Sequence, residues 1–245
     1  MFSIIAHKAA RSIPRVARFI PRASRSILPA SRSIPNAARL IHASVPQNTR
    51  CPKCSQPLPT PLPACTNCWH ISTLPPDTRF HDIFDLPYEP NPFLVDVSLL
   101  KKRFRDAQSI CHPDSWASKG SNKQDVAQAL SARINEAYQG LLNPLSRAEY
   151  ILQRHHIPVS ETDQVNDMQF MSEIMEARET IEDAENESDV LSVMGETRDG
   201  IKSTIDELEG LIGKMQWEDA KSAAVRLRYL EGIERAAKKW LDNHS

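Results

Sequence analysis

In the stretch RDAQSICHPDSW (residues 105–116), a helical pattern ends at a histidine, which is followed directly by a proline and an aspartate. Two simple explanations exist. The proline bars the residue before it from the helix, so the corner can be only a helix terminator, or the tripeptide can be a chance occurrence. The tripeptide alone does not show whether this corner has a function. The flanking sequence therefore has to be considered with it.

Apolar residues on both sides of the corner recur at helical spacing, and this predicts two antiparallel helices joined by a loop that contains His112-Pro113-Asp114. The face opposite the first stripe carries Lys101, Lys102 and Arg105. Short helices are predicted at FHDIFDLP (80–87), anchored by Ile83 and Phe84, and at PLSRAEYILQRHHI (144–157). The first stripe is Val97, Leu100, Phe104, Ala107 and Cys111, and the second, within 123–142, is Ala127, Leu130, Ile134, Tyr138 and Leu141.

This order of helices and the corner resemble a J domain, the module through which co-chaperones act on DnaK-type chaperones. The resemblance implies that His112, Pro113 and Asp114 bind the partner's ATPase unit, while Lys101, Lys102 and Arg105 steer association. Taken alone, these cations favour an ordinary solvated face, and the tripeptide beside them reverses that balance. A His-Asp catalytic dyad is the enzymatic alternative, but no nucleophile accompanies it, and Cys111 belongs to the apolar stripe. The first glycine is Gly120, so no phosphate-binding loop precedes it, and nucleotide use is assigned to the partner.

Charge divides the chain into three parts. Residues 1–76 hold ten Lys/Arg and no acid, 77–158 balance ten against ten, and 159–245 carry ten bases against twenty-one acids. The first fifty residues are rich in Arg, Ser and Pro and lack a continuous apolar centre, which predicts a mitochondrial transit peptide rather than a secretory signal. A basic arm for nucleic acid is the alternative. RLIHAS (39–44) resembles a matrix-protease processing site, and no apolar run is long enough to cross a membrane.

Four of the five cysteines form two pairs, Cys51-x2-Cys54 and Cys65-x2-Cys68, separated by ten residues that include four prolines. Paired thiolates at this spacing predict a structural zinc with no open coordination position, and disulfides or redox thiols are the alternatives. Because this segment is too short for a core, metal binding would supply its folding free energy. His70 lies near the second pair and is interpreted as a surface histidine.

The acidic tail has three helical patterns, at about 163–186, 188–213 and 216–242, and these predict an antiparallel bundle. The first stripe is expected to pack against the second. The first stripe is Phe170, Ile174, Ala177, Ile181 and Ala184, the second is Val190, Met194, Ile201, Ile205 and Leu208, and the third is Ala220, Ala223, Leu227, Leu230, Ile233, Ala237 and Trp240.

Several tail side chains project away from these stripes. Met168, Met171 and Met175 lie to one side of the first stripe with Glu176 and Glu179 beside them, and Tyr229 points away from the third. An apolar strip with flanking carboxylates is typical of a partner surface. The alternative is that the methionines only widen the buried face.

MQFMSEIMEARETI (168–181) and AVRLRYLEGIE (224–234) resemble the scaffold-binding bundle of HscB/Jac1-type co-chaperones of iron–sulfur cluster biogenesis. INEAYQGLLNPLSRAEYIL (134–152) is similar to the end of the same family's J domain, and the four-cysteine segment resembles the zinc-bearing mitochondrial form. The resemblance covers the chain after about residue 50. It implies that Met171, Met175, Glu176, Glu179 and Tyr229 contact the scaffold, with methionine at two positions where leucine is common.

The expected fold is all-α: a J domain followed by an antiparallel three-helix bundle, with a small N-terminal four-cysteine zinc knuckle. The expected parts are a transit peptide (1–48), the zinc segment (49–76), the J domain (77–158) and the scaffold-binding tail (159–245). We expect a non-enzymatic co-chaperone of the mitochondrial matrix that binds neither nucleic acid nor membrane. A general folding or import J protein would need a Gly/Phe-rich linker or a substrate-binding β domain, and a zinc-stabilised nucleic-acid binder would need a basic mature chain.

Overall fold

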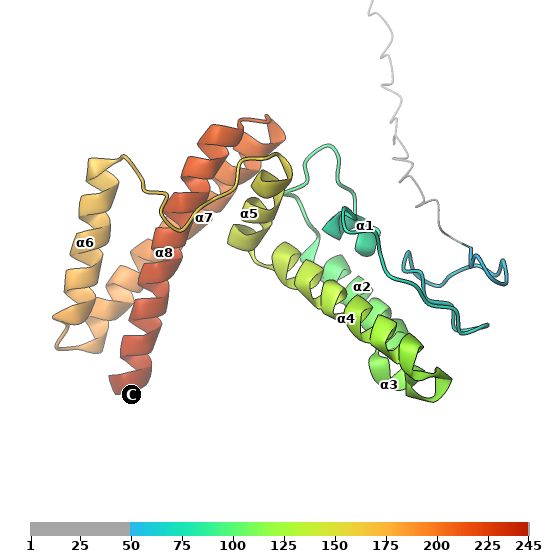
Figure 1. Ribbon diagram of the computed structural model, residues 1–245. Helices are drawn as coiled ribbons and strands as arrows, with labels where there is room; N and C mark the ends of the chain where they lie inside the picture. Colours follow the sequence, from blue (N-terminus) through green and yellow to red (C-terminus); the bar gives the residue numbers. More distant parts are fainter. Residues whose placement is uncertain (1–49, 245) are drawn as a thin grey trace, which may run out of the picture. The chain divides into compact units, whose positions relative to one another are not determined.

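The computed structural model describes residues 50–244, and the expected transit peptide (1–48) lies outside them. The described residues fold into helices without extended strands, since only the isolated bridges Arg50–Pro57 and Ala64–Ile71 pair there (Figure 1). This confirms the all-α class. The helices are α1 (Phe80–Ile83), α2 (Val97–Cys111), α3 (Pro113–Trp116), the 3-10 turn η1 (Ala117–Lys119), α4 (Ser121–Leu142), α5 (Pro144–Arg154), α6 (Met168–Glu182), α7 (Glu187–Gly213) and α8 (Trp217–His244).

The ends of α2 follow from its local sequence. The Asp96 carboxylate accepts hydrogen bonds from the backbone N–H groups of Ser98 and Leu99, which would otherwise be unpaired at the start of the helix. Pro113 forces His112 into extended backbone (φ −61°, ψ 126°), so α2 ends at Cys111. Both ends agree with the prediction. The expected plain loop after His112 is instead the short helix α3 followed by η1.

The α2–α4 hairpin encloses the first hydrophobic cluster. Leu100, Ala107 and Cys111 of α2 face the buried stripe of α4, and the cluster is covered by Ile83 of α1 and by its C-cap residue Phe84, which are 2% and 1% exposed. The cysteine segment contributes Leu62, Ala64 and Ile71 to the same cluster. These sixteen buried side chains therefore join the segment and the hairpin in one core.

Helix α5 packs on the tail as well as following the J-domain hairpin, a double role that the sequence patterns did not indicate. Its buried face enters a second cluster with Leu208 of α7 and Leu227 of α8. Arg147 fixes α5, because its buried guanidinium donates to the carbonyls of Leu141 (2.7 Å) and Phe93 (2.8 Å). The residues of α5 in this cluster are Leu145, Ala148, Ile151 and Leu152.

Helix α6 covers a shorter part of the tail than predicted. It begins at Met168 instead of about 163, because Asp167 caps it and Asp163 belongs to a loop that Lys221 holds by an ion pair of 3.0 Å. Ile174 and Ile181 pack with Val190 and Met194, as expected. The expectation that α6 also covers Ile201, Ile205 and Leu208 is wrong, since these three residues lie in the second cluster, with α5.

Within residues 50–244, none of the helices combines the length and the apolar character that a membrane crossing requires.

Candidate functional site

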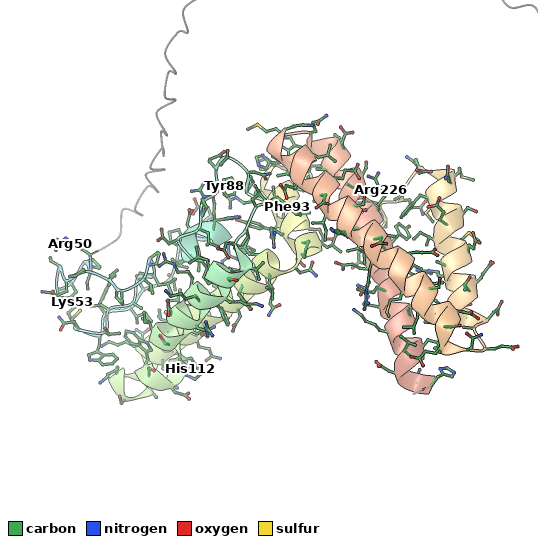
Figure 2. The ribbon with its side chains drawn as sticks, turned by 180° about the vertical axis from the view of Figure 1, so that it is seen from behind. Arg50, Lys53, Tyr88, Phe93, His112 and Arg226 are labelled. Atoms are coloured by element: carbon green, nitrogen blue, oxygen red, sulfur yellow. The ribbon has the colours of Figure 1, made fainter. Side chains whose placement is uncertain are left out.

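The corner, residues His112-Pro113-Asp114, lies at the exposed junction between α2 and α3. His112 is the N-cap of α3, and its Nδ1 accepts a hydrogen bond of 3.3 Å from the Asp114 backbone N–H. The same Nδ1 lies 3.6 Å from a carboxylate oxygen of Asp114. Figure 2 shows His112 at the opposite end of α2 from Phe93. The side chains of His112 and Asp114 are 55% and 87% exposed, so both can contact a partner.

The base of the corner is the buried side chain of Trp116. It is fully buried, and its Nε1–H donates to the carbonyl of Ile110 at 2.9 Å. This bond joins the end of α3 to the last turn of α2. A four-residue helix has too few hydrogen bonds to persist alone, so Trp116 is what holds α3 in place.

The predicted cationic face is present on α2. Lys101, Lys102 and Arg105 are all exposed, and in the described part of the chain none of them forms an ion pair. Arg103 differs, because it pairs with Asp85 at 3.2 Å and supports the fold. These three cations give the exposed face of α2 a positive charge.

The chemistry at the corner does not favour nucleophilic catalysis. Cys111 is fully buried, and burial raises the pKa of its thiol to about 12. A thiol in that environment is inert at neutral pH.

The four paired cysteines converge on one point. Their sulfur atoms all lie within 4.8 Å of one another, with Cys51 and Cys68 at 3.5 Å and Cys54 and Cys65 at 3.7 Å. Four sulfurs around a tetrahedral zinc at about 2.3 Å would lie about 3.8 Å apart, so the spacing fits a metal and is far longer than a disulfide bond. His70 is not part of this group. The cysteines can therefore hold a metal ion.

The surroundings of the cysteines favour the thiolate form at Cys54 and oppose it at Cys68. A backbone hydrogen bond from Gln56 lowers the pKa of Cys54 to about 6, whereas desolvation raises the pKa of Cys68 to about 12. Two tight backbone turns position the pairs: Ser55 N–H donates to Cys51 O, and Cys65 N–H donates to His70 O, both at 2.8 Å. A bound cation would favour deprotonation at all four sulfurs.

The tail patch, residues Met171, Met175, Glu176, Glu179 and Tyr229, is divided between α6 and α8, which pack together. Met175 is 58% exposed, the two glutamates are exposed, and Met171 and Tyr229 are partly buried. The ring of Tyr229 meets Phe170 edge-to-face with centroids 6.3 Å apart. The neighbouring Met168 is 86% exposed.

Comparisons with known proteins address the identity of this arrangement. The family model of the HSCB C-terminal oligomerisation domain matches residues 166–238. The human iron–sulfur cluster co-chaperone protein HscB is 32% identical over 175 residues, which are 71% of this chain and 73% of the human protein. The chain belongs to the HscB family of co-chaperones.

Other HscB proteins agree with this assignment. The HscB homolog of Photobacterium profundum is 32% identical over 157 residues, covering 62% of this chain and 90% of the bacterial protein. The crystal structure of human HscB superposes with a TM-score of 0.67 at 29% identity, covering 78% of this chain and 97% of the human one. Jac1 from Saccharomyces cerevisiae has a TM-score of 0.54 at 19% identity, covering 66% and 96%, and shows the shared fold alone.

One feature of this HscB family member that sequence reasoning missed is a groove between α6 and α7. It has a volume of about 700 Å³, and Leu230 and Ile233 of α8 also line it. Glu176 lines the groove, whereas Met171 and Met175 do not, so the patch wraps around α6. Small residues of α7, such as Ser192, Gly200 and Ser203, line the groove and are the sequence signal that could have indicated it.

The second omission is a pair of tryptophans. Trp69, which directly follows Cys68, packs edge-to-face on Trp116 with centroids 5.4 Å apart and an interplanar angle of 80°. Sequence reasoning treated the cysteine segment and the corner as separate, because nothing in the spacing of residues 51–68 indicates what lies against them. The tryptophans bring the two sites together.

Proposed function

We propose that the chain is a mitochondrial co-chaperone that binds an iron–sulfur scaffold protein through its tail and presents it to a DnaK-type chaperone. The corner stimulates the ATPase of that chaperone, which promotes cluster transfer, and the chain itself performs no catalysis. The observation that carries the proposal is the corner itself: an exposed His112-Pro113-Asp114, fixed by a cap and a buried tryptophan, in a chain of the HscB family.

Each surface has a distinct role in this proposal. His112, Pro113 and Asp114 contact the chaperone, and Lys101, Lys102 and Arg105 steer the encounter. Met171, Met175, Glu176, Glu179 and Tyr229 contact the scaffold. The division at residue 158 separates the chaperone-binding part from the scaffold-binding tail. The two parts still share a hydrophobic cluster, because α5 packs on α8.

In this proposal a structural zinc is held by four cysteines, which are Cys51, Cys54, Cys65 and Cys68. Four thiolates leave no position for water, so the zinc supplies folding free energy to residues 49–76 and no chemistry. The basic, acid-free residues 1–48 support import into the mitochondrial matrix. Residues 50–245 carry 22 Lys/Arg and 31 Asp/Glu, which opposes nucleic acid as a partner.

The test uses the purified chain without residues 1–48, a mitochondrial DnaK-type chaperone and the scaffold. His112→Gln should abolish ATPase stimulation while scaffold binding is retained and the melting temperature stays close to the wild-type value, because the histidine side chain is 55% exposed and contributes only one cap hydrogen bond of 3.3 Å. His156→Asn is the matched control, since His156 is exposed on left-handed backbone (φ 63°) that asparagine tolerates. Full stimulation by His112→Gln would overturn the proposed function.

A further inference from the structure

We infer that the four-cysteine segment positions the corner through Trp69, which packs on Trp116 beneath the His112-Pro113-Asp114 turn. The inference rests on the proposed function in one respect, that the corner is the surface the chaperone contacts. Trp69 and Trp116 are positioning residues in this account, because neither belongs to the exposed corner itself.

Trp69 contacts both pieces of chain that follow the corner. One edge-to-face contact is with Trp116, the last residue of α3, and the Nζ of Lys119 in η1 lies 3.9 Å from the centroid of the Trp69 ring. Edge-to-face aromatic pairs and cations over an indole face are both attractive beyond the area they bury. The single side chain of Trp69 therefore binds α3 and η1 at once.

The corner depends on such support because α3 has little stability of its own. It contains four residues, and its only side-chain cap is the 3.3 Å hydrogen bond to His112 Nδ1. The indole of Trp116 is fully buried, so its burial against neighbours fixes α3 relative to α2. Removing one of those neighbours should loosen Asp114 and Pro113 together.

The position of Trp69 is in turn set by the cysteine loop. Trp69 directly follows Cys68 and has left-handed backbone (φ 55°), which a bulky side chain rarely adopts and which the surrounding turn must enforce. That turn is closed by the bond from Cys65 N–H to His70 O (2.8 Å) and by the bridge between Ala64 and Ile71. Cys65 and Cys68 belong to the four-cysteine cluster and flank this turn in sequence, so a metal ion held by the cluster would restrain the turn as well.

Coupling between the metal site and the corner follows from these contacts. Metal binding orders the turn, the turn presents Trp69, and Trp69 holds α3 in the conformation in which His112 and Asp114 are displayed. Metal loss should therefore loosen the corner, while the tail patch, which is built on a different cluster, stays ordered.

The experiment measures amide hydrogen exchange in residues 113–119 of the zinc-loaded protein, alongside zinc content and ATPase stimulation. Trp69→Ala should speed exchange there by about fivefold, as expected for the loss of one aromatic pair, and should lower stimulation while zinc and scaffold binding are retained. Trp69→Phe keeps an aromatic ring at this position and should restore both the slow exchange and the ATPase stimulation. Trp240→Ala, a matched tryptophan deletion in α8, should leave residues 113–119 unchanged.

Removal of zinc with a chelator is the second part of the experiment. In the wild type it should speed exchange in residues 113–119, and in Trp69→Ala it should add little, because the connection is already broken. Equal loosening by chelation in both proteins would overturn the inference, as would unchanged exchange in zinc-loaded Trp69→Ala.

If the Trp69→Ala variant loses its zinc, the Lys119→Met variant tests the same contact instead. This variant leaves the cysteine loop intact and should speed exchange by about twofold through loss of the cation over the ring. Wild-type exchange in Lys119→Met would then overturn the inference. Failure of the proposed function would give a different result. In that case the His112→Gln variant would keep full ATPase stimulation, whatever the exchange rates in residues 113–119 are.

Discussion

The corner and the tail patch both offer side chains at the surface, but their side chains relate to the core differently. His112 and Asp114 have no part in a hydrophobic cluster, and they are held by the cap between them and by Trp116, which is buried in the first cluster. In the patch, Tyr229 belongs to the margin of the third cluster and meets the ring of Phe170 there. We therefore expect corner substitutions to leave the hydrophobic clusters intact, whereas patch substitutions change some packing in the third cluster.

The supports beneath the two surfaces differ as well. The corner stands on the first cluster, which has sixteen buried residues drawn from the cysteine segment, α1 and the residues that follow it, α2, α3 and α4. The patch stands on the third cluster, which has six, and a groove separates part of α6 from α7. We expect α6 to be the more adaptable element, suited to an apolar partner that packs on it.

Metal removal should give the largest difference between the two regions. We expect one zinc per chain, with an apparent binding free energy of about 10 kcal/mol or more, and loss of order in residues 50–76 on chelation. The helices α6, α7 and α8 should keep their circular dichroism and scaffold affinity. Metal analysis of Cys68→Ser should show loss of zinc, and Cys111→Ala should keep it, since Cys111 lies outside the cluster. A purified protein with two disulfides and no zinc contradicts this prediction.

Truncation of the patch should have the next largest effect. Replacing Met171, Met175 and Tyr229 by alanine should weaken scaffold binding by several kcal/mol, since buried interface anchors commonly cost about 1–2 kcal/mol each. Met175 is 58% exposed, so its truncation should hardly change stability, and Tyr229 should account for most of a modest loss. Calorimetric titration and thermal melts of the same variants separate the two effects.

The matched control for the patch is Leu191→Ala, because Leu191 is a 45% exposed apolar residue on α7 outside the patch. It should bind the scaffold as the wild type does. Wild-type affinity in the triple variant would show that the scaffold binds elsewhere, and early melting with a proportionate loss of binding would assign the three side chains to the core.

Acid should weaken the part that supports the corner. Burial lowers the pKa of His81 in α1 to about 4, with only its Nε2 hydrogen-bonded, to Pro92 O at 2.9 Å. The unfolded chain, with a histidine pKa of about 6.5, binds the proton more readily. Stability is therefore complete above about pH 6.5 and falls as the pH decreases to 4, by about 3 kcal/mol from this group.

Urea unfolding at pH 7 and pH 4 measures this loss, and His81→Gln, which keeps a donor but does not titrate, should reduce it. The difference between the two pH values is the informative quantity, because the substitution also changes stability at pH 7. An unchanged difference in His81→Gln would assign the acid sensitivity to other groups. Hydrogen exchange should place the early opening at α1 and leave α6 unaffected.

The sequence predicted the elements that depend on local physics. The ends of α2 follow from the Asp96 cap and from Pro113, both of which are readable in the sequence. It predicted less well which helices pack on each other, because α5 is amphipathic whether its partner is α4 or α8. The contact of Trp69 with Trp116 joins positions 47 residues apart, and no periodicity or charge pattern encodes such a pair.

The smallest expected effect concerns charge at the patch. Glu176→Lys and Glu179→Lys should each slow scaffold association by about two- to threefold at low salt and reduce its salt dependence, because rim charges act mainly on the encounter. Glu176 lines the groove between α6 and α7, whereas Glu179 does not, so stopped-flow rates for the two variants report which side of α6 faces the scaffold. Asp206→Lys makes the same charge change at an exposed position of α7. Equal slowing by all three variants would mean that the net charge of the tail, and not the patch, attracts the scaffold, and wild-type rates in both glutamate variants would exclude these carboxylates from the encounter.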